Sequence, residues 1–497
     1  MKYYSTRNQN LQPPVSSAQA IKQGLAADGG LFLPLPDELP HLSSELLSHL
    51  RGVSYAERAA RIMKLFLDDY TEEELLSDCR AAYAEDAFPG GPAPLVELDS
   101  KHPMFSMELW HGPTAAFKDM ALQIMPRLLS RALKKTGETR TALILVATSG
   151  DTGKAALEGY RDIPQTRMVV FYPVDGVSQV QKLQMATQEG ANVDVLAIRG
   201  NFDDAQSGVK QIFSDPGART AFDQKGYLLS SANSINWGRL LPQIVYYISA
   251  YCDLINKGTL KEGDAFHVCV PTGNFGNIFA AYLAGRMGVP IGKLVCASNS
   301  NCVLTDFLTT GVYDRNRPFH LTMSPSMDIL ISSNLERLLF YTAGMEKTAS
   351  YMQQLQQTGS YQIDDETHSA ISERFVGLYA DEAQTAETIH TCFHEKGYLC
   401  DTHTAVALCC AQRYRKSSGD TTPIVVASTA SPYKFAKAVF RSISGRDAAD
   451  DLSALEELHQ LSGVPIPYPL RDLKDRKVRF TRTIDKGEML STVLGDL

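Results

Sequence analysis

The sequence lacks the features that would place the protein in a membrane or on a nucleic acid. No apolar run approaches the roughly 18 residues of a membrane-spanning helix. The N-terminal residues form neither an apolar secretory segment nor an Arg- and Ser-rich transit segment, so we expect a cytoplasmic protein. The 48 Lys and Arg residues are outnumbered by 56 Asp and Glu residues, and the net charge of −8 argues against nucleic acid as the main partner.

Paired cysteine motifs, internal repeats and long low-complexity tracts are also missing. The nine cysteines are scattered between Cys79 and Cys410, and none belongs to a C-x-x-C pair. This pattern is typical of reduced, mostly buried thiols, and it predicts no metal site. The 497 residues are too many for one compact core, so we expect two or three domains.

From residue 95 onward the sequence alternates buried strands with helices. Apolar runs of strand length are followed by turns of small residues and then by helical patterns, at 141–147, 168–173, 193–198, 266–271 and 423–430. This order predicts an α/β fold with open, mostly parallel sheets flanked by helices. In such sheets, functional sites lie at the carboxyl ends of the strands.

The same pattern suggests how the chain is divided. Helical periodicity within residues 1–95, followed by a linker at 89–92, predicts a separate N-terminal domain. Residues 96–440 would form the main α/β region in two subdomains, the smaller at roughly 140–235. Residues 441–497 would form a helical or irregular C-terminal segment. We also expect a helix at 371–379, within a polar insertion or lid.

One lysine stands out because of its neighbours. The turn signal Gly112-Pro113 is followed by Thr114, a candidate N-cap, and then by a helix-favouring run that contains Lys118. A lysine in an apolar setting near a helix N-terminus is disfavoured as a cation, and as a neutral amine it can form a Schiff base. The alternative is a surface lysine whose ammonium group reaches water.

Three turns between a strand and a helix are candidate anion sites. Backbone N–H groups at a helix N-terminus favour anions, and the arginine fork suits phosphate. For each turn, the alternative is ordinary capping without a ligand. The candidate residues are Ser149, Asp151 and Thr152; Asn233, Ser234 and Arg239; and Gly273, Asn274, Phe275, Gly276 and Asn277. The last turn has neither the Walker spacing nor the G-x-G-x-x-G spacing.

These segments resemble the threonine synthases. Residues 112–119 carry the family's G-P-T-x-A-F-K-D residues, with Lys118 as the cofactor lysine. The runs T-S-G-D-T-G at 148–153, N-S-I-N-x-x-R at 233–239 and P-S-M-D-I at 325–329 follow in the family's order. The resemblance implies a fold-type II enzyme, similar to the tryptophan synthase β subunit, with pyridoxal 5′-phosphate (PLP) on Lys118.

The resemblance also implies roles for the candidate residues. Lys118 would be the catalytic residue, Ser149, Asp151 and Thr152 would hold the substrate carboxylate, and Asn233, Ser234 and Arg239 would hold the substrate phosphate. The other cofactor-binding residues would be Phe117, Gly273, Asn274, Phe275, Gly276, Asn277 and Thr429, the last facing the pyridine nitrogen.

The chain departs from the family at two positions near its end. Thr402 replaces the usual Pro before His403, which is either a base or a histidine that supports the helix start. Ser431 replaces a frequent His.

The implied reaction converts O-phospho-L-homoserine and water to L-threonine and phosphate, the last step of threonine biosynthesis. The enzyme would be a PLP-dependent carbon–oxygen lyase that works as a monomer or homodimer. Two alternatives stay open: a lyase that releases 2-oxobutyrate, ammonia and phosphate, and a non-catalytic protein that binds PLP or a metabolite.

Overall fold

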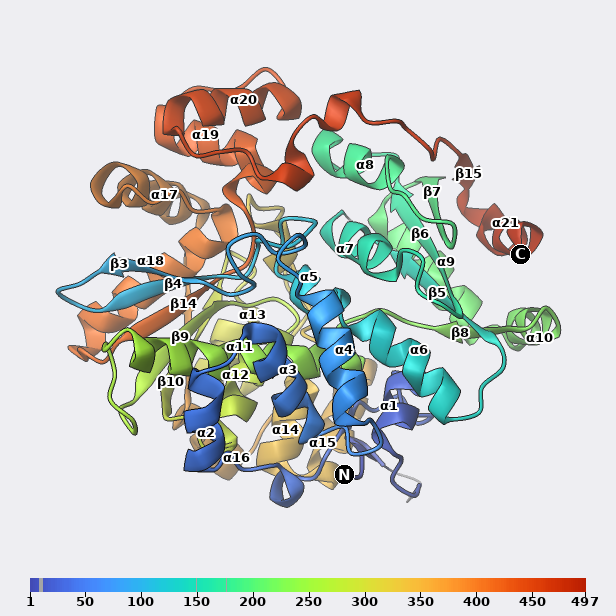
Figure 1. Ribbon diagram of the computed structural model, residues 1–497, viewed down its shortest axis with the longest axis horizontal. Helices are drawn as coiled ribbons and strands as arrows, with labels where there is room; N and C mark the ends of the chain where they lie inside the picture. Colours follow the sequence, from blue (N-terminus) through green and yellow to red (C-terminus); the bar gives the residue numbers. More distant parts are fainter. Residues whose placement is uncertain (9–11, 149, 176) are drawn as a thin grey trace.

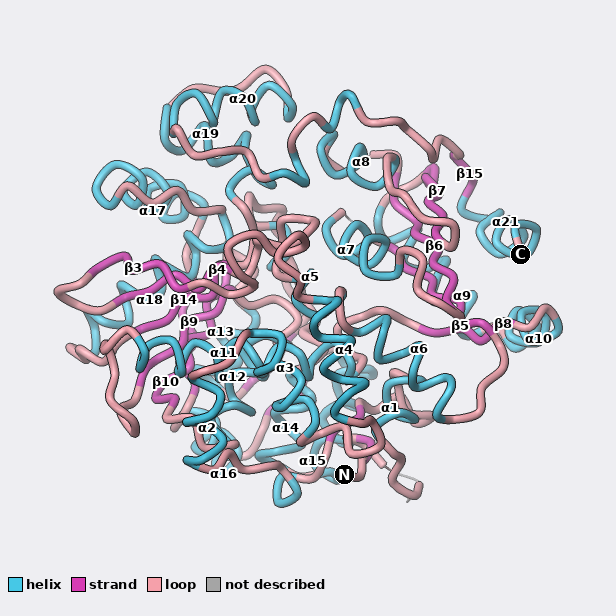
Figure 2. The backbone as a smooth tube through the Cα atoms, in the orientation of Figure 1, coloured by secondary structure: helices cyan, strands magenta, loops and turns pink. Residues whose placement is uncertain are grey.

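Two open sheets, each flanked by helices, form the body of the molecule (Figures 1 and 2). The computed structural model describes residues 1–8, 12–148, 150–175 and 177–497. Among these residues, no helix is both long and apolar enough to span a membrane.

The larger sheet has six strands in the order β13-β10-β9-β14-β4-β3. Its strands are β3 (Leu95–Asp99), β4 (Met104–Glu108), β9 (Phe266–Pro271), β10 (Ile291–Ser298), β13 (Phe375–Tyr379) and β14 (Ile424–Ser428). All neighbours are parallel except β3 and β4, which are antiparallel. Strands β9 and β14 are buried at every position, as the apolar runs predict for strands covered by helices on both faces.

The smaller sheet has five parallel strands in the order β15-β7-β6-β5-β8. They are β5 (Thr141–Ala147), β6 (Thr166–Pro173), β7 (Val193–Arg199), β8 (Tyr227–Ser230) and β15 (Thr483–Asp485). The strand β15 comes from the C-terminal segment, which returns across the molecule to the outer edge of this sheet (Figure 1).

The N-terminal residues pack against the long buried helix α11 (Trp237–Asn256). The Trp237 ring packs against the rings of Tyr3 and Phe66, at centroid distances of 5.5 and 5.6 Å. The N-terminal elements are β1 (Tyr4–Ser5), α1 (Ser17–Gln23), β2 (Phe32–Leu33), α2 (Ser44–Arg51), α3 (Tyr55–Lys64) and α4 (Glu72–Ala82). This packing fixes the start of α11, which carries one of the predicted site residues.

The remaining helices cover the two sheets and connect their strands. They are α5 (Lys118–Leu122), α6 (Met125–Lys135), α7 (Asp151–Tyr160), α8 (Gln179–Ala186), α9 (Phe202–Ser214), α10 (Pro216–Gln224), α12 (Gly276–Arg286), α13 (Val303–Thr310), α14 (Leu335–Ala343), α15 (Met345–Thr358), α16 (Asp365–Ser372), α17 (Glu382–Lys396), α18 (Thr402–Ser418), α19 (Ala436–Ser444), α20 (Asp451–Ser462) and α21 (Met489–Asp496). A small hairpin of β11 (Val312–Asp314) and β12 (Ser360–Gln362) completes the described fold.

The helix predicted at 371–379 is wrong. Helix α16 ends at Ser372, and the following residues form β13, which pairs in parallel with β10. Gly377 lets helix α13 pack closely on this strand, because a Cβ atom there would lie 2.9 Å from the Thr305 Cα. A short apolar run can form either a helix or a strand. Here the segment forms a strand because it pairs with the edge of β10. The domain boundaries at 95 and 440 stay predictions.

Candidate active site

Lys118 is the first residue of the short helix α5, which lies between the two sheets (Figure 1). The helix predicted to start after Thr114 is wrong, since the N-cap of α5 is Phe117. Thr114 instead binds the Asp119 carboxylate, to which its backbone N–H and its hydroxyl donate at 2.8 and 2.6 Å. Ala115 has a φ of 59° inside the resulting turn. The residues that match the family motif therefore build a tight loop that presents Lys118.

This lysine turn is fastened to the carboxyl end of β14. The Phe117 N–H donates to the Thr429 carbonyl at 2.8 Å, and the Ser431 N–H donates to the Ala115 carbonyl at 3.0 Å. The Thr429 side chain is buried beside this contact. Lys118 and Thr429 thus come together at the strand end where the fold class predicts a site.

Asp119 makes the stability of this turn depend on pH. Burial raises the pKa of Asp119 to about 6, although both Thr114 bonds favour the charged form. The folded state therefore retains the proton to higher pH than the unfolded chain, whose Asp has a pKa near 3.8. The resulting stabilisation is present below about pH 4 and is lost as the pH rises through 6.

We expect Asp119→Asn to remove this pH dependence. As the pH rises from 4 to 7, the melting temperature of the wild type should fall relative to that of the variant. The corresponding loss in the unfolding free energy of the wild type is about 3 kcal/mol. Thermal unfolding of both proteins across this range tests it, with the exposed Asp203→Asn as the control. A constant difference between wild type and variant would contradict the assignment.

The Lys118 amine lies in a largely buried, polar-lined position. Its side chain is 12% exposed, and its Nζ lies 3.4 Å from the Ser326 Oγ and 3.8 Å from the Asp151 Oδ2. Burial lowers the pKa of Lys118, and the nearby Arg239 and Lys434 lower it further, whereas Asp151 opposes the shift. This is the environment in which a lysine reacts as a neutral amine.

The predicted cofactor loop connects β9 to the N-terminus of α12. Phe275 has a φ of 63°, and a Cβ atom at Gly273 would lie 2.6 Å from the Ser326 carbonyl oxygen. Asn277 is buried, and its Nδ2 has no hydrogen-bond partner among the described residues. A close backbone approach, an unpartnered buried N–H donor and a helix N-terminus together suit a phosphate group. The residues present therefore fit PLP, with its phosphate in this loop.

The predicted carboxylate site lies at the N-terminus of α7, where Ser149 falls outside the described residues. Asp151 is the first residue of α7, and Thr152 follows it, half-buried. The Asp151 carboxylate accepts hydrogen bonds from the Lys434 Nζ and the Gln181 Nε2, both at 2.9 Å. Burial raises the pKa of Asp151, but Lys434, Lys118 and Gln181 outweigh it and hold the pKa well below its usual value.

Arg239 lies in the first turn of α11 as a buried cation without a carboxylate partner among the described residues. Its Nη1 donates to the Ala232 carbonyl at 2.6 Å, and its Nε has no partner in the same part of the chain. Burial lowers the pKa of Arg239 to about 10, so it stays charged at neutral pH. A buried guanidinium with free N–H groups is suited to bind an anion such as phosphate.

The other two residues of this turn are less enclosed. The Asn233 side chain is exposed, and Ser234 is half-buried with its Oγ 3.4 Å from the Asn334 Nδ2. The residue that caps α11 is Asn236, which was not among the predicted site residues. Its side chain accepts from the Gly238 N–H at 2.9 Å and donates to the Ile21 carbonyl at 3.0 Å.

His403 supports the site rather than facing it as a base. Its Nδ1 lies 2.8 Å from the Asp401 Oδ2, and its Nε2 accepts the Ser326 N–H at 3.1 Å. Both ring nitrogens are thus engaged, and the hydrogen-bond network assigns the proton to Nδ1. Ser326 in turn contacts both Lys118 and Gly273, so His403 fixes the segment that joins the lysine to the cofactor loop.

Replacing His403 by alanine should loosen this segment. The change leaves the Ser326 N–H without its acceptor and removes one of several donors to the Asp401 carboxylate, at a cost of about 1–3 kcal/mol in unfolding free energy. We expect a lower melting temperature and a PLP affinity reduced by about ten-fold. Differential scanning fluorimetry and equilibrium dialysis measure the two effects. Thr402→Pro is the control, since proline is tolerated at the first position of α18; unchanged cofactor affinity in His403→Ala would refute the supporting role.

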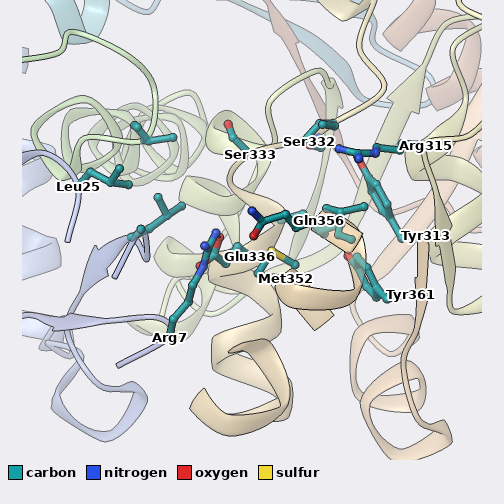
Figure 3. A pocket seen from close by; sticks show the side chains of 16 residues that line it. Arg7, Leu25, Tyr313, Arg315, Ser332, Ser333, Glu336, Met352, Gln356 and Tyr361 are labelled. Carbon is teal, nitrogen blue, oxygen red and sulfur yellow. Dashed lines mark hydrogen bonds and ion pairs between the residues drawn. The ribbon is translucent and has the colours of Figure 1, made fainter. Parts of the chain in front are cut away.

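A cavity of about 330 Å³ is lined by residues other than those predicted for the site (Figure 3). Its wall includes Arg7, Glu336, Tyr313 and Ser332, but not the lysine turn. The Ser332 Oγ donates to the Gly273 carbonyl at 2.7 Å. One lining residue thus contacts the cofactor loop, but none of the predicted site residues that the structure describes lines the cavity.

Models of protein families match most of the chain. "Threonine synthase N terminus" matches residues 2–83, "Pyridoxal-phosphate dependent enzyme" matches residues 87–430, and "Threonine synthase, C-terminal" matches residues 404–490. These matches confirm the predicted PLP cofactor and the fold-type II class.

Individual proteins agree with the family models. The chain is 38% identical to the threonine synthase of Pseudomonas aeruginosa over 487 residues, which cover 97% of this chain and 95% of that protein. It is 39% identical to the human threonine synthase-like 1 over 468 residues, or 92% of this chain, but spans 61% of that protein's length. The crystal structure of PLP-bound threonine synthase from Brucella melitensis superposes with a TM-score of 0.87 at 38% identity, covering 100% of this chain and 98% of that one. The chain therefore belongs to the threonine synthase family of PLP-dependent enzymes.

Proposed function

We propose that the protein converts O-phospho-L-homoserine and water to L-threonine and phosphate, with PLP on Lys118. The observation that carries the proposal is the pair of anion sites beside one buried lysine. The glycine loop with Asn277 suits the cofactor phosphate. Arg239, which has no carboxylate partner within the described part of the chain, suits a second phosphate. A PLP enzyme acting on an unphosphorylated amino acid has no use for the second site.

PLP, when bound, supplies a ring that takes up the electron pair left by a departing proton. The amine of Lys118, whose pKa burial lowers, would remove one proton from the substrate Cα and one from Cβ as the phosphate leaves Cγ. It would then return one proton at Cγ and, after water has added at Cβ, one at Cα. The Thr429 hydroxyl, at the end of β14, would face the ring nitrogen as a neutral partner.

Two further groups orient the substrate. The backbone N–H groups at the start of α7, around Thr152, bind its carboxylate. Arg239 binds its phosphate, and the guanidinium stabilises the charge that this group carries as it leaves. Asn233 and Ser234 would complete the phosphate site. Ser149, which falls outside the described residues, would help to bind the substrate carboxylate. Water then adds at Cβ to give the threonine hydroxyl.

Product analysis separates this proposal from its alternatives. Purified protein, PLP and O-phospho-L-homoserine are mixed, and phosphate, threonine and 2-oxobutyrate are quantified together. Phosphate matched by threonine supports the synthase. Phosphate matched by 2-oxobutyrate means the lyase, and no phosphate release means a binding protein.

We also propose a cytoplasmic enzyme that acts as a monomer or homodimer and divides near residues 95 and 440. The nine cysteines, all of them free thiols, support the location. Light scattering of the purified protein measures the oligomeric state, and limited proteolysis maps the boundaries.

A further inference from the structure

We propose that Lys434 is a positioning residue that neutralises Asp151, so that the N-terminus of α7 can accept a substrate carboxylate. This inference rests on the proposed function. Lys434 lies outside the family motifs found in the sequence. Its role follows from the like charges of Asp151 and a substrate carboxylate. A helix N-terminus attracts a carboxylate, but an ionised Asp151 in the first turn of α7 would repel it.

The geometry shows how the conflict is resolved. Lys434 lies in the short 3-10 helix Pro432–Phe435 after β14, and its side chain is completely buried. Its Nζ contacts the Asp151 Oδ1 at 2.9 Å and the Gln184 Oε1 at 2.8 Å. Asp151 thus has a short, fully enclosed ion pair on one side, where solvent does not screen it.

The second cation near Asp151 cannot neutralise it throughout the reaction. The Lys118 Nζ lies 3.8 Å from the Asp151 Oδ2, and its charge would be lost when the amine reacts or is deprotonated. Lys434 then remains as the lasting counter-ion of Asp151. Among the described residues, no other Lys or Arg forms an ion pair with this carboxylate.

The same contact joins the two sheets. Lys434 follows the end of β14 in the larger sheet, whereas Asp151 and Gln184 belong to helices of the smaller sheet. Ser431, at the start of the same 3-10 helix, is bonded to the lysine turn through Ala115. Lys434 therefore holds α7 in place relative to Lys118, and it also neutralises the charge of Asp151 at the N-terminus of α7.

The test separates charge from packing with a set of variants. Lys434→Gln keeps a hydrogen-bond donor but removes the charge, and the double variant Asp151→Asn/Lys434→Met removes both charges. Lys154→Gln is the matched control, because Lys154 is a buried lysine of α7 that pairs with Glu158 instead. Cofactor absorbance reports the binding of L-2-aminobutyrate, an amino acid with a carboxylate but no phosphate.

We expect Lys434→Gln to weaken L-2-aminobutyrate binding by at least about ten-fold, and to raise KM for O-phospho-L-homoserine more than it lowers kcat. The double variant should recover most of the lost affinity, which a purely structural role of Lys434 does not predict. Lys154→Gln should bind as the wild type does.

A second readout uses the chain without cofactor. Since Lys434 lowers the pKa of Lys118, its loss should shift the pH profile of PLP uptake upward, and the additional loss of Asp151 should shift it back. Equal L-2-aminobutyrate affinity in wild type and Lys434→Gln, or a double variant as weak as the single one, overturns the inference. If phosphate release is absent in all proteins while affinity follows the expected order, the inference stands and the proposed reaction fails.

Discussion

Lys118→Ala is expected to lose the lysine-linked absorption of the cofactor and at least about a thousand-fold in the rate of phosphate release. Alanine supplies neither the amine that holds PLP nor the group that moves protons at the substrate Cα, Cβ and Cγ. The fold should survive, because the bonds that shape the turn come from Thr114 and Asp119 and from the backbone of Phe117. Free PLP would still find the loop at 273–277, but with weaker retention.

Absorption spectra before and after dialysis, and mass spectrometry after borohydride reduction, measure the loss. The exposed Lys257→Ala is the control and should retain a reduced adduct at Lys118. An adduct on another lysine, or an unchanged absorption band in Lys118→Ala, would show that the cofactor lysine is misassigned.

Arg239→Met should have opposite effects on catalysis and on stability. We expect KM for O-phospho-L-homoserine to rise by about a hundred-fold, because the buried charge that meets the phosphate is lost. The melting temperature of the cofactor-free protein should rise, because the guanidinium is buried, keeps its charge at neutral pH and donates to Ala232 alone among the described carbonyls. Replacing a residue that serves binding at a cost in stability commonly makes the ligand-free protein more stable.

Arg337 provides the matched comparison. It is also completely buried, and burial lowers its pKa to about 9. Its guanidinium, however, donates to Asn334 Oδ1 and to the carbonyls of Phe32 and Ile235. Arg337→Met should therefore lower the melting temperature, through the loss of these bonds. If both arginine variants shift the melting temperature in the same direction, Arg239 is a structural residue and the phosphate site lies elsewhere.

The parts of the site that the sequence predicted are those made by contiguous residues. The turn around Lys118 and the glycine loop are local structures, whose small residues are required by contacts such as that of Gly273 with Ser326. Arg239 could be predicted as a site residue because it closes a short motif at a helix start, and this assignment stays a prediction. The start of α5 was misplaced because Asp119 captures the hydroxyl expected to cap it.

The residues that were missed act across the fold. Lys434 acquires its importance from Asp151, which lies in the other half of the molecule, and no local pattern signals such a pair. Strand β13 depends on the free edge of β10 rather than on its own five residues. The role of His403 was left open because only the tertiary structure brings Ser326 to its ring.

The strand β15 has a consequence for how the chain must be made. It covers the hydrogen-bonding edge of β7, yet the ribosome synthesises it long after β7 has emerged. Until that segment arrives, a nascent chain with a folded smaller sheet presents a bare strand edge, which is a template for pairing with other chains. Prematurely terminated chains should therefore accumulate as aggregates, and the burden on chaperones should end only when the C-terminal segment docks.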